Sequence, residues 1–178
     1  TTNDYSSADY YYVNKSSLPK VYGGFNTSLS WKGFDLSAIF AYSIGGYIYN
    51  RDITMILHNG SLEGRDWSTE ILRRWTPDNR YTDVPALSTT SNNWNSASTR
   101  FLQNNSYMRL KNLTLSYNLP KQWISKLSLS SVQVYVQGDN LFTIHRNQGL
   151  DPEQGITGIT YYRYPAMRTI SGGINLSF

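Results

Sequence analysis

The sequence of 178 residues contains no cysteine, so neither a disulfide framework nor a cysteine-based zinc site can form. No run of the sequence approaches the roughly 20 consecutive apolar residues of a membrane-spanning helix. Residues 1–20 lack the apolar core of a secretory signal sequence. Charge is also scarce: the net charge is +4, and the basic residues are scattered except for Arg73-Arg74. This distribution disfavours nucleic acid as a partner.

Aromatic residues are abundant, with 15 tyrosines and 5 tryptophans. Such a composition is typical of two kinds of protein. The aromatic rings can form surfaces on which sugars stack, or they can form the interfacial girdles of a membrane β-barrel. The sequence favours girdles combined with an ordinary apolar core.

Five segments alternate between apolar and polar residues with a period of two, which predicts β-strands. They are residues 21–31, 34–49, 107–118, 131–142 and 167–178. In the second segment, one face carries Phe34, Leu36, Ala38, Phe40, Tyr42, Ile44 and Ile48. Most of the segments reach the roughly 9–11 residues that a tilted membrane strand needs. The predicted fold is therefore all-β, with antiparallel transmembrane β-barrel strands.

The last of these segments alternates up to its final residue, with Ile174, Leu176 and Phe178 on its apolar face. An apolar terminal edge invites aggregation in a soluble domain, whereas a barrel strand that faces lipid requires one. We therefore predict that Phe178, Leu176 and Ile174 form a barrel-assembly signal, in addition to packing against lipid.

Short and long connections alternate between the predicted strands. The turn at Lys32-Gly33 and the link 119–130 are short, whereas residues 50–106 and 143–166 form long loops. Outer-membrane barrels have short periplasmic turns and long extracellular loops. We therefore expect residues 1–20 to be an extracellular loop segment and residues 21–178 to form barrel strands. Because the smallest membrane barrels have eight strands, five strands predict the C-terminal piece of a larger barrel.

The third predicted strand contains a conflict. Leu113, Leu115 and Tyr117 share a face, and the same alternation would place Arg109 and Lys111 toward lipid. A charge at mid-depth costs about 2–4 kcal/mol. We predict a β-bulge near Lys111-Asn112 that switches the faces; the alternative is a position for both cations high on the barrel rim.

Within the first long loop, apolar residues recur at helical spacing before Pro77: Trp67, Ile71, Leu72 and Trp75. This pattern predicts a short amphipathic helix that ends at the proline. Trp67 and Trp75 would then either pack in the core of the loop or face a partner protein.

Several blocks of the sequence resemble SusC/RagA-type TonB-dependent transporters, the glycan and peptide importers of Bacteroidetes outer membranes. The longest is YMRLKNLTLSYNLP at residues 107–120. The others are GGFN at 23–26, WKGFDL at 31–36, RWTP at 74–77, VYVQGDNLFT at 134–143, GLDPE at 149–153 and YPAMRT at 164–169. Together the blocks cover nearly the whole chain, in the order of the family.

This resemblance implies a barrel of about 22 strands with a plugged lumen, located in the bacterial outer membrane. It implies that an N-terminal plug and a segment that contacts TonB precede this part of the protein. It also implies that a SusD-like surface lipoprotein caps the extracellular loops. The function implied is import of oligosaccharides or peptides, without catalysis and without a cofactor.

The residues themselves offer little catalytic chemistry. The two histidines, His58 and His145, lie in or beside predicted loops, and Asp151-Pro152-Glu153 has the composition of a turn. Neither a catalytic nor a metal site is predicted. Candidate substrate contacts are aromatic, amide or basic residues in loops or on the lumen face: Trp94, Tyr161, Tyr162 and Arg163 in loops, and Tyr135 and Gln137 facing the lumen. For Tyr161 and Tyr162 the alternative is packing within the loop.

Two other functions remain open at this stage. A secreted β-sandwich that binds carbohydrate would also be rich in Trp, Tyr and Asn, although the long first loop disfavours it. A surface-adhesion barrel would share the strands but not the SusC-like blocks. The sequence does not identify the cargo.

Overall fold

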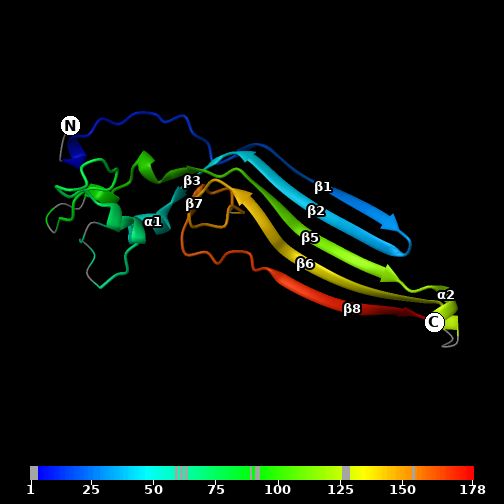
Figure 1. Cartoon of the computed structure of the whole chain (residues 1–178). Helices are drawn as coiled ribbons and strands as arrows, with labels where there is room; N and C mark the ends of the chain where they lie inside the picture. Colours follow the sequence, from blue (N-terminus) through cyan, green and yellow to red (C-terminus); the bar gives the residue numbers. More distant parts are fainter. Residues whose placement is uncertain are drawn as a thin grey trace.

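The computed structural model describes residues 4–58, 60, 62, 64–88, 90, 93–125, 129–153 and 155–178. Its main element is a five-stranded antiparallel sheet in the order β1-β2-β5-β6-β8 (Figure 1). The strands are β1 (Pro19–Trp31), β2 (Phe34–Gly45), β5 (Tyr107–Asn118), β6 (Ser131–His145) and β8 (Thr169–Ser177). These strands match the five predicted segments closely, apart from the end of the second.

The connections leave the sheet at two different ends (Figure 1). At one end, Lys32 and Gly33 form the β1–β2 turn, and both have positive φ angles, 47° and 88°. This backbone matches the twist of a tight hairpin. The link between β5 and β6, which contains α2 (Lys121–Ile124), lies at the same end. Both long connections lie at the opposite end, as the alternation of short and long links requires.

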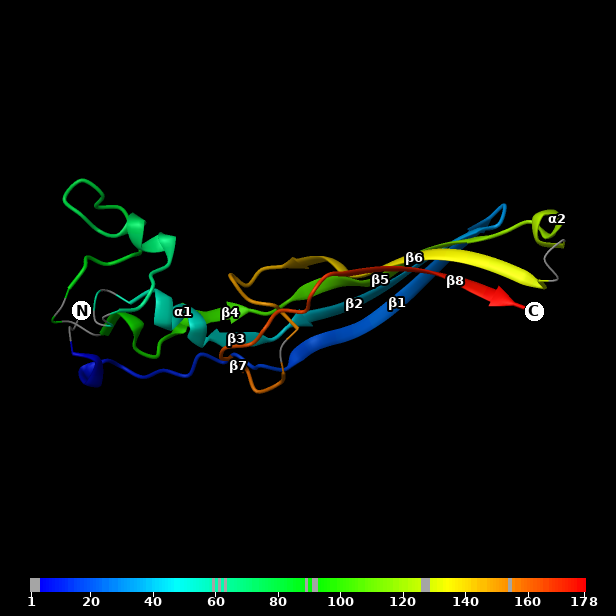
Figure 2. The same ribbon diagram turned by 90° about the horizontal axis from the view of Figure 1, so that it is seen from below.

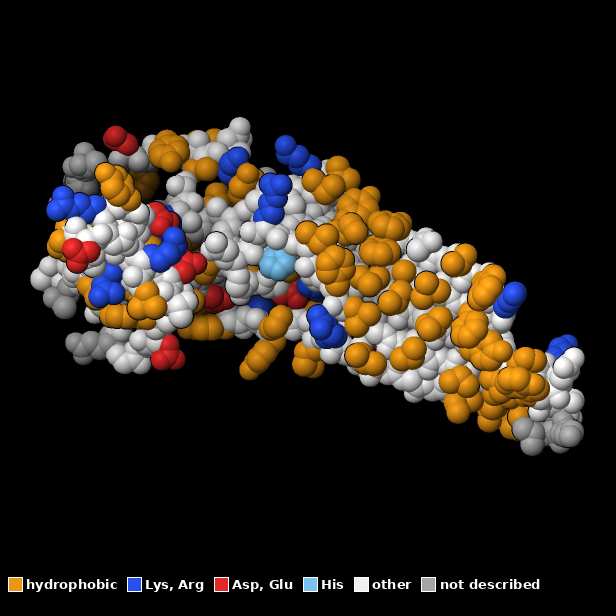
Figure 3. All heavy atoms as spheres, viewed as in Figure 1, with side chains coloured by type: hydrophobic (Ala, Val, Ile, Leu, Met, Phe, Trp, Pro, Cys, Tyr) orange, Lys and Arg blue, Asp and Glu red, His pale blue; other side chains and the backbone are white. Residues whose placement is uncertain are grey.

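One face of the five-stranded sheet is apolar, and its side chains are exposed. Phe25 pairs with Phe40 in the register of β1 and β2, and their rings stack with centroids 4.7 Å apart. The same face continues across β5, β6 and β8, where Leu115, Val136 and Ile174 remain substantially exposed. Figure 3 shows hydrophobic side chains gathered over the strands, and Figure 2 shows the sheet as one curved layer.

The predicted β-bulge in the third strand is confirmed. The pairing of β5 shifts between Leu110 and Asn112 on the β6 side and opposite Ile39 and Phe40 on the β2 side. Relative to β2, Lys111 is the extra residue, whereas relative to β6 the extra residue lies in β6, where Asn140 and Leu141 stand opposite Lys111. After the shift, Arg109 lies opposite Ala41 and Thr143 on the polar face, and it is buried.

The prediction that the second strand runs to Tyr49 is wrong. β2 ends at Gly45, and Gly45 and Gly46 both adopt positive φ angles, 83° and 76°. The chain then enters β3 (Tyr47–Asn50), which belongs to a separate sheet with β4 (Leu102–Asn104) and β7 (Ile159–Thr160). Ile48 is consequently buried in that region instead of lying on the apolar face. Gly45 and Gly46 carry no side chain, so the alternation of apolar and polar residues continued across them in the sequence. The alternation therefore did not reveal the end of β2.

The end of the molecule beyond the sheet forms a second region, which we call the loop cluster. It contains the β4-β3-β7 sheet, α1 (Arg51–Ile56) and four 3₁₀ turns, η1 (Tyr5–Ser7), η2 (Thr69–Arg73), η3 (Asn93–Asn95) and η4 (Thr99–Phe101). Its core is formed by buried apolar side chains: Ile48, Leu57, Ile71, Val84 and Phe101. Among the residues that the structure describes, no helix has both the length and the apolar character to cross a membrane.

The amphipathic helix predicted before Pro77 is wrong in extent. Only the five-residue turn η2 forms there, and the side chain of Ser68 caps its first turn by accepting the N–H of Glu70. Trp67 and Trp75 lie outside η2. The N–H of Trp75 donates to the carbonyl of Val84, so it does not bond within a continuing helix.

Candidate functional site

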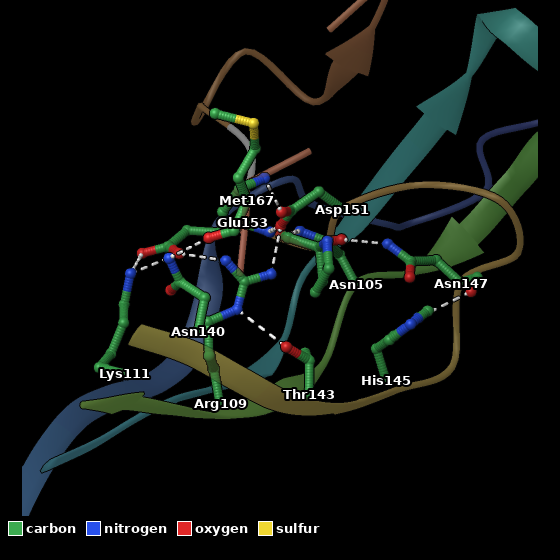
Figure 4. Close-up of polar contacts among 12 residues, drawn as sticks. Asn105, Arg109, Lys111, Asn140, Thr143, His145, Asn147, Asp151, Glu153 and Met167 are labelled. Atoms are coloured by element: carbon green, nitrogen blue, oxygen red, sulfur yellow. Dashed lines mark hydrogen bonds and ion pairs between the residues drawn. The ribbon is translucent and has the colours of Figure 1, made fainter. Parts of the chain in front are cut away.

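Residues 146–166, which form most of the connection between β6 and β8, are held against the polar face of the sheet by Arg109 (Figure 4). The guanidinium donates to Asp151 Oδ1 at 2.6 Å and to Glu153 Oε2 at 2.8 Å, and its Nε donates to Thr143 Oγ1 at 2.9 Å. Lys111 Nζ binds Glu153 Oε1 at 2.6 Å. We call these five residues the Arg109 cluster.

The β-bulge creates this cluster from a local conflict in the strand. If the alternation of β5 continued without a bulge, Arg109 and Lys111 would share the apolar face of Leu113 and Leu115. The bulge instead brings both cations to the carboxylates of segment 146–166. It therefore keeps both charges away from the apolar face of the sheet.

The centre of the cluster is buried: the side chains of Arg109 and Asp151 are 4% and 7% exposed. Burial alone would raise the pKa of Asp151. The N–H groups of Ala166 and Glu153 and the Arg109 guanidinium outweigh it, so that the pKa lies below its usual value. A buried pair whose polar atoms are satisfied in this way holds a fixed geometry, and removal of one partner is costly.

Further contacts hold segment 146–166 along its length. Asn105 Nδ2 donates to the carbonyl of Pro152 at 2.9 Å, and Asn147 Nδ2 donates to Asn105 Oδ1 at 2.9 Å. Beyond these, Ser17 Oγ donates to the carbonyl of Ile156, and the N–H of Tyr49 donates to the carbonyl of Gly158. The segment therefore connects the polar face of the sheet with the loop cluster, to which its β7 strand belongs.

A cavity of about 560 Å³ lies beside segment 146–166. It is lined by residues from α1, from β5 and β6, and from segment 146–166; those with polar or aromatic side chains are Asp52, Arg109, Thr143, His145, Asp151, Tyr162 and Arg163. Tyr162 has a positive φ angle of 46°, and its N–H donates to Asp52 Oδ1 at 3.0 Å. Asp52 thus fixes Tyr162 in a backbone conformation that L-residues rarely adopt.

Three of the candidate substrate contacts lie together. The rings of Tyr161 and Tyr162 are 4.3 Å apart, and the Arg51 guanidinium lies 4.8 Å from the Tyr161 ring. Both tyrosines are nevertheless about half exposed, so they pack within the loop and still present a surface. Tyr162 and the adjacent Arg163 line the cavity.

The other three candidates lie elsewhere. Tyr135 and Gln137 are on the polar face of β6, where Tyr135 lies over Gly173 and Gln137 Nε2 donates to Asp139. Trp94 belongs to η3, and the Arg100 guanidinium lies 3.3 Å from its ring centroid. None of the three lines the cavity, so the six candidates do not form one site.

The remaining singled-out residues are also placed. Trp67 Nε1 donates to Nδ1 of the buried His58 at 3.0 Å, which joins Trp67 to the core of the loop cluster. Trp75 is partly exposed. Ile174 and Leu176 pair with Val134 and Val132 on the apolar face, and Phe178 follows β8. The roles of these residues in lipoprotein contact and barrel assembly stay predictions.

The sequence did not reveal the Arg109 cluster. Its signals were present: two cations with the wrong parity in a strand, and Asp151 and Glu153 two residues apart in a distant loop. The pairing between them was not predicted because the acidic residues were interpreted as part of a turn. Among the described residues, no group of three or more His, Asp or Glu side chains is arranged to hold a metal ion.

No protein-family model matches the chain, but individual relatives do. It is 34% identical to TonB-dependent receptor P3 of Formosa agariphila over 87% of the chain and 16% of that protein. It is 28% identical to TonB-dependent receptor SusC of Bacteroides thetaiotaomicron over 94% of the chain and 16% of that protein.

Solved structures give the same result. The RagAB peptide importer in its closed-closed state superimposes with a TM-score of 0.81 and 36% identity, over 93% of this chain and 18% of the matched chain. In its open-open state the TM-score is 0.82. The chain thus spans less than a fifth of the length of these relatives, which are transporters of the bacterial outer membrane and not enzymes. Within that span, the chain belongs to the SusC/RagA-type TonB-dependent receptors.

Proposed function

We propose that this chain is the C-terminal barrel segment of a TonB-dependent outer-membrane importer, which takes up oligosaccharides or peptides together with a SusD-like lipoprotein. One observation carries the proposal. A single-layer sheet leaves its apolar face exposed, while its polar face receives a long segment pinned by the buried Arg109–Asp151 ion pair. A barrel sheet needs these two faces, because its outer face contacts lipid and its inner face contacts a solvated lumen.

The edges of the sheet support a larger barrel. In the described part of the chain, β1 and β8 each pair with a neighbour on one side only. Unpaired edges of this length are a liability in an isolated sheet. Continuation of the sheet into a closed barrel of about 22 strands removes both edges.

The partners follow from the position of the loop cluster. With the short turns on the periplasmic side, the loop cluster and segment 146–166 lie at the extracellular mouth. A SusD-like lipoprotein would cap this end, and the partly exposed Trp67 and Trp75 are candidate contacts for it. The similarity to the RagAB complex supports such a pairing and supports a peptide as cargo, alongside an oligosaccharide.

The alternative, a secreted β-sandwich that binds carbohydrate, requires two sheets packed face to face. The described strands form one five-stranded layer and one small three-stranded sheet, and the apolar face of the large sheet is exposed. This arrangement favours the importer.

Two epitope tags test location and orientation in the complete receptor that contains this chain. One tag is inserted after the exposed Arg80 in the loop cluster, and the other replaces the Lys32-Gly33 turn. We expect antibodies to label intact cells only through the first tag and to reach the second after the outer membrane is opened. Labelling of both tags, or of neither, on intact cells contradicts the proposal.

Uptake of a labelled peptide and a labelled oligosaccharide then tests transport in cells with and without the receptor and TonB. We expect uptake of at least one of the two classes to require both proteins. Uptake of both classes that is unchanged when the receptor is deleted would sink the importer function.

A further inference from the structure

We propose that the cavity beside segment 146–166 is a ligand subsite for a molecule that carries both a carboxylate and an amine. This inference rests on the proposed importer function, because the cavity lies at the expected extracellular mouth. It assigns the contacts to Arg163, Asp52 and Tyr162, with the Arg109 cluster as the fixed floor.

The charges that line the cavity carry the inference. Arg109 and Asp151 form a buried pair at 2.6 Å and neutralise each other. Arg163 has no hydrogen-bond or ion-pair partner among the described residues. Asp52 accepts the backbone N–H of Tyr162 but, within the same described part of the chain, has no cationic partner. One positive and one negative side chain therefore line the cavity without counter-charges, and they do not pair with each other.

The geometry indicates a site that is already formed. A volume of about 560 Å³ lies within the range of small-molecule pockets. Asp52 holds Tyr162 at its positive φ angle, and strained residues of this kind are enriched at ligand-binding positions. The Arg163 guanidinium lies over the backbone of Gly155, since a Cβ atom added there would be 3.6 Å from Nη1. Arg163 is thus placed by the anchored segment and Asp52 by α1.

The chemistry of these groups selects the ligand. A guanidinium binds a carboxylate through two parallel hydrogen bonds, and a carboxylate side chain accepts from an ammonium group. The ring of Tyr162, which is adjacent to Arg163 in the sequence and whose N–H donates to Asp52, supplies an aromatic surface in the cavity. A neutral oligosaccharide would leave both Arg163 and Asp52 without a counter-charge. A ligand that lacks either the carboxylate or the amine would leave one of these two side chains without a counter-charge.

Binding to the purified complete receptor tests the inference by isothermal titration calorimetry. The probes are trialanine, N-acetyl-trialanine, trialanine amide and maltotriose, with muramic acid as an amino sugar that carries the same two groups. We expect trialanine to bind, and we expect acetylation or amidation to weaken it about tenfold each. Comparison of trialanine with muramic acid distinguishes a peptide from an amino-sugar source.

Two variants assign the contacts. Arg163→Gln should remove the difference between trialanine and trialanine amide while the effect of acetylation persists. Asp52→Asn should remove the effect of acetylation only, because the asparagine oxygen still accepts the N–H of Tyr162. Arg65→Gln and Asp66→Asn are the matched controls: both residues are exposed in the loop cluster and do not line the cavity, and binding should be unchanged.

The inference is overturned if neither trialanine nor muramic acid binds, if blocked and free probes bind equally, or if the variants weaken all probes alike. Each of these results can occur while TonB-dependent uptake in cells continues. In that case the importer function stands and only the subsite is rejected. Loss of uptake together with loss of surface labelling would instead reject the importer.

Discussion

The loop cluster buries its apolar side chains, whereas the five-stranded sheet exposes those on its apolar face. In the loop cluster, apolar side chains such as Phe101 and Ile48 are 1% exposed, as in a soluble domain. In the sheet, Leu115 and Phe25 are 43% and 48% exposed, although they are no less apolar. One chain therefore contains a region that folds around its own core and a region whose apolar surface requires another solvent. In the proposed function, the bilayer provides that solvent for the sheet.

The comparison predicts the largest effects where a buried group loses its partners. Arg109→Met leaves the 7%-exposed Asp151 without its cation, and a broken buried ion pair costs about 3–5 kcal/mol. We expect segment 146–166 to detach from the sheet and to be cleaved faster by protease in the complete receptor. Arg73→Met is the control, because Arg73 is 59% exposed and an exposed ion pair contributes about 0–1 kcal/mol. Equal protection in wild type and Arg109→Met would show that the cluster does not hold the segment.

A cavity in the core of the loop cluster should have an effect of similar size. Phe101→Ala removes a fully buried ring, which costs about 3–5 kcal/mol. We expect faster hydrogen exchange in β3 and β4, which surround it, while the exchange of the five-stranded sheet is unchanged. Phe25→Ala, on the apolar face of the sheet, should leave β3 and β4 protected. If the two variants change the same strands, the two regions are not separate.

A charge on the apolar face should have a somewhat smaller effect. Leu115→Lys places an ammonium on the lipid-facing surface and should destabilise the reconstituted receptor by about 2–4 kcal/mol. The measurement is the free energy of unfolding in vesicles by denaturant titration. Leu72→Lys is the matched control, since Leu72 is exposed in the loop cluster and its change should stay within about 0.5 kcal/mol. If Leu115→Lys is tolerated as well as Leu72→Lys, water bathes this face.

The smallest effect concerns pH. The pKa of Asp151 is lowered in the folded protein, so its contribution to stability is present above the usual carboxyl value of about 4 and is lost as pH falls through the folded pKa. A fluorophore attached to Thr157→Cys should report loosening of segment 146–166 only below about pH 4. Asp151→Asn should remove most of this pH dependence. Loosening between pH 5 and 7 would point to a different titrating group.

Much of the sheet could be predicted from the sequence. Strict alternation around Leu36, Val134 and Ile174 sets both the strands and their faces, because a strand with one buried face has only one acceptable register. Even the bulge at Lys111 was predictable, since the alternation breaks there between two cations and an apolar face. The blocks shared with the SusC/RagA family pointed to the same architecture.

The loop cluster and the cavity were largely not predictable. Residues that form its core, such as Ile48, Val84 and Phe101, lie 36 and 17 positions apart in the sequence and follow no period. The break after Gly45 depends on two positive φ angles, and the contact of Asp52 with Tyr162 joins residues 110 positions apart. Tyr162 and Arg163 were singled out as loop residues, but only the folded chain shows which charges they meet.

The environment of the apolar face can be measured directly with single cysteines at Leu113, Thr114 and Leu115 in the reconstituted complete receptor. A fluorophore on each cysteine is exposed to lipids that carry bromine on their acyl chains, which quench only through direct contact in the hydrocarbon. We expect strong quenching at 113 and 115 and little at 114. Equal quenching at the three positions, or none at 113 and 115, would contradict the assignment of this face to the bilayer.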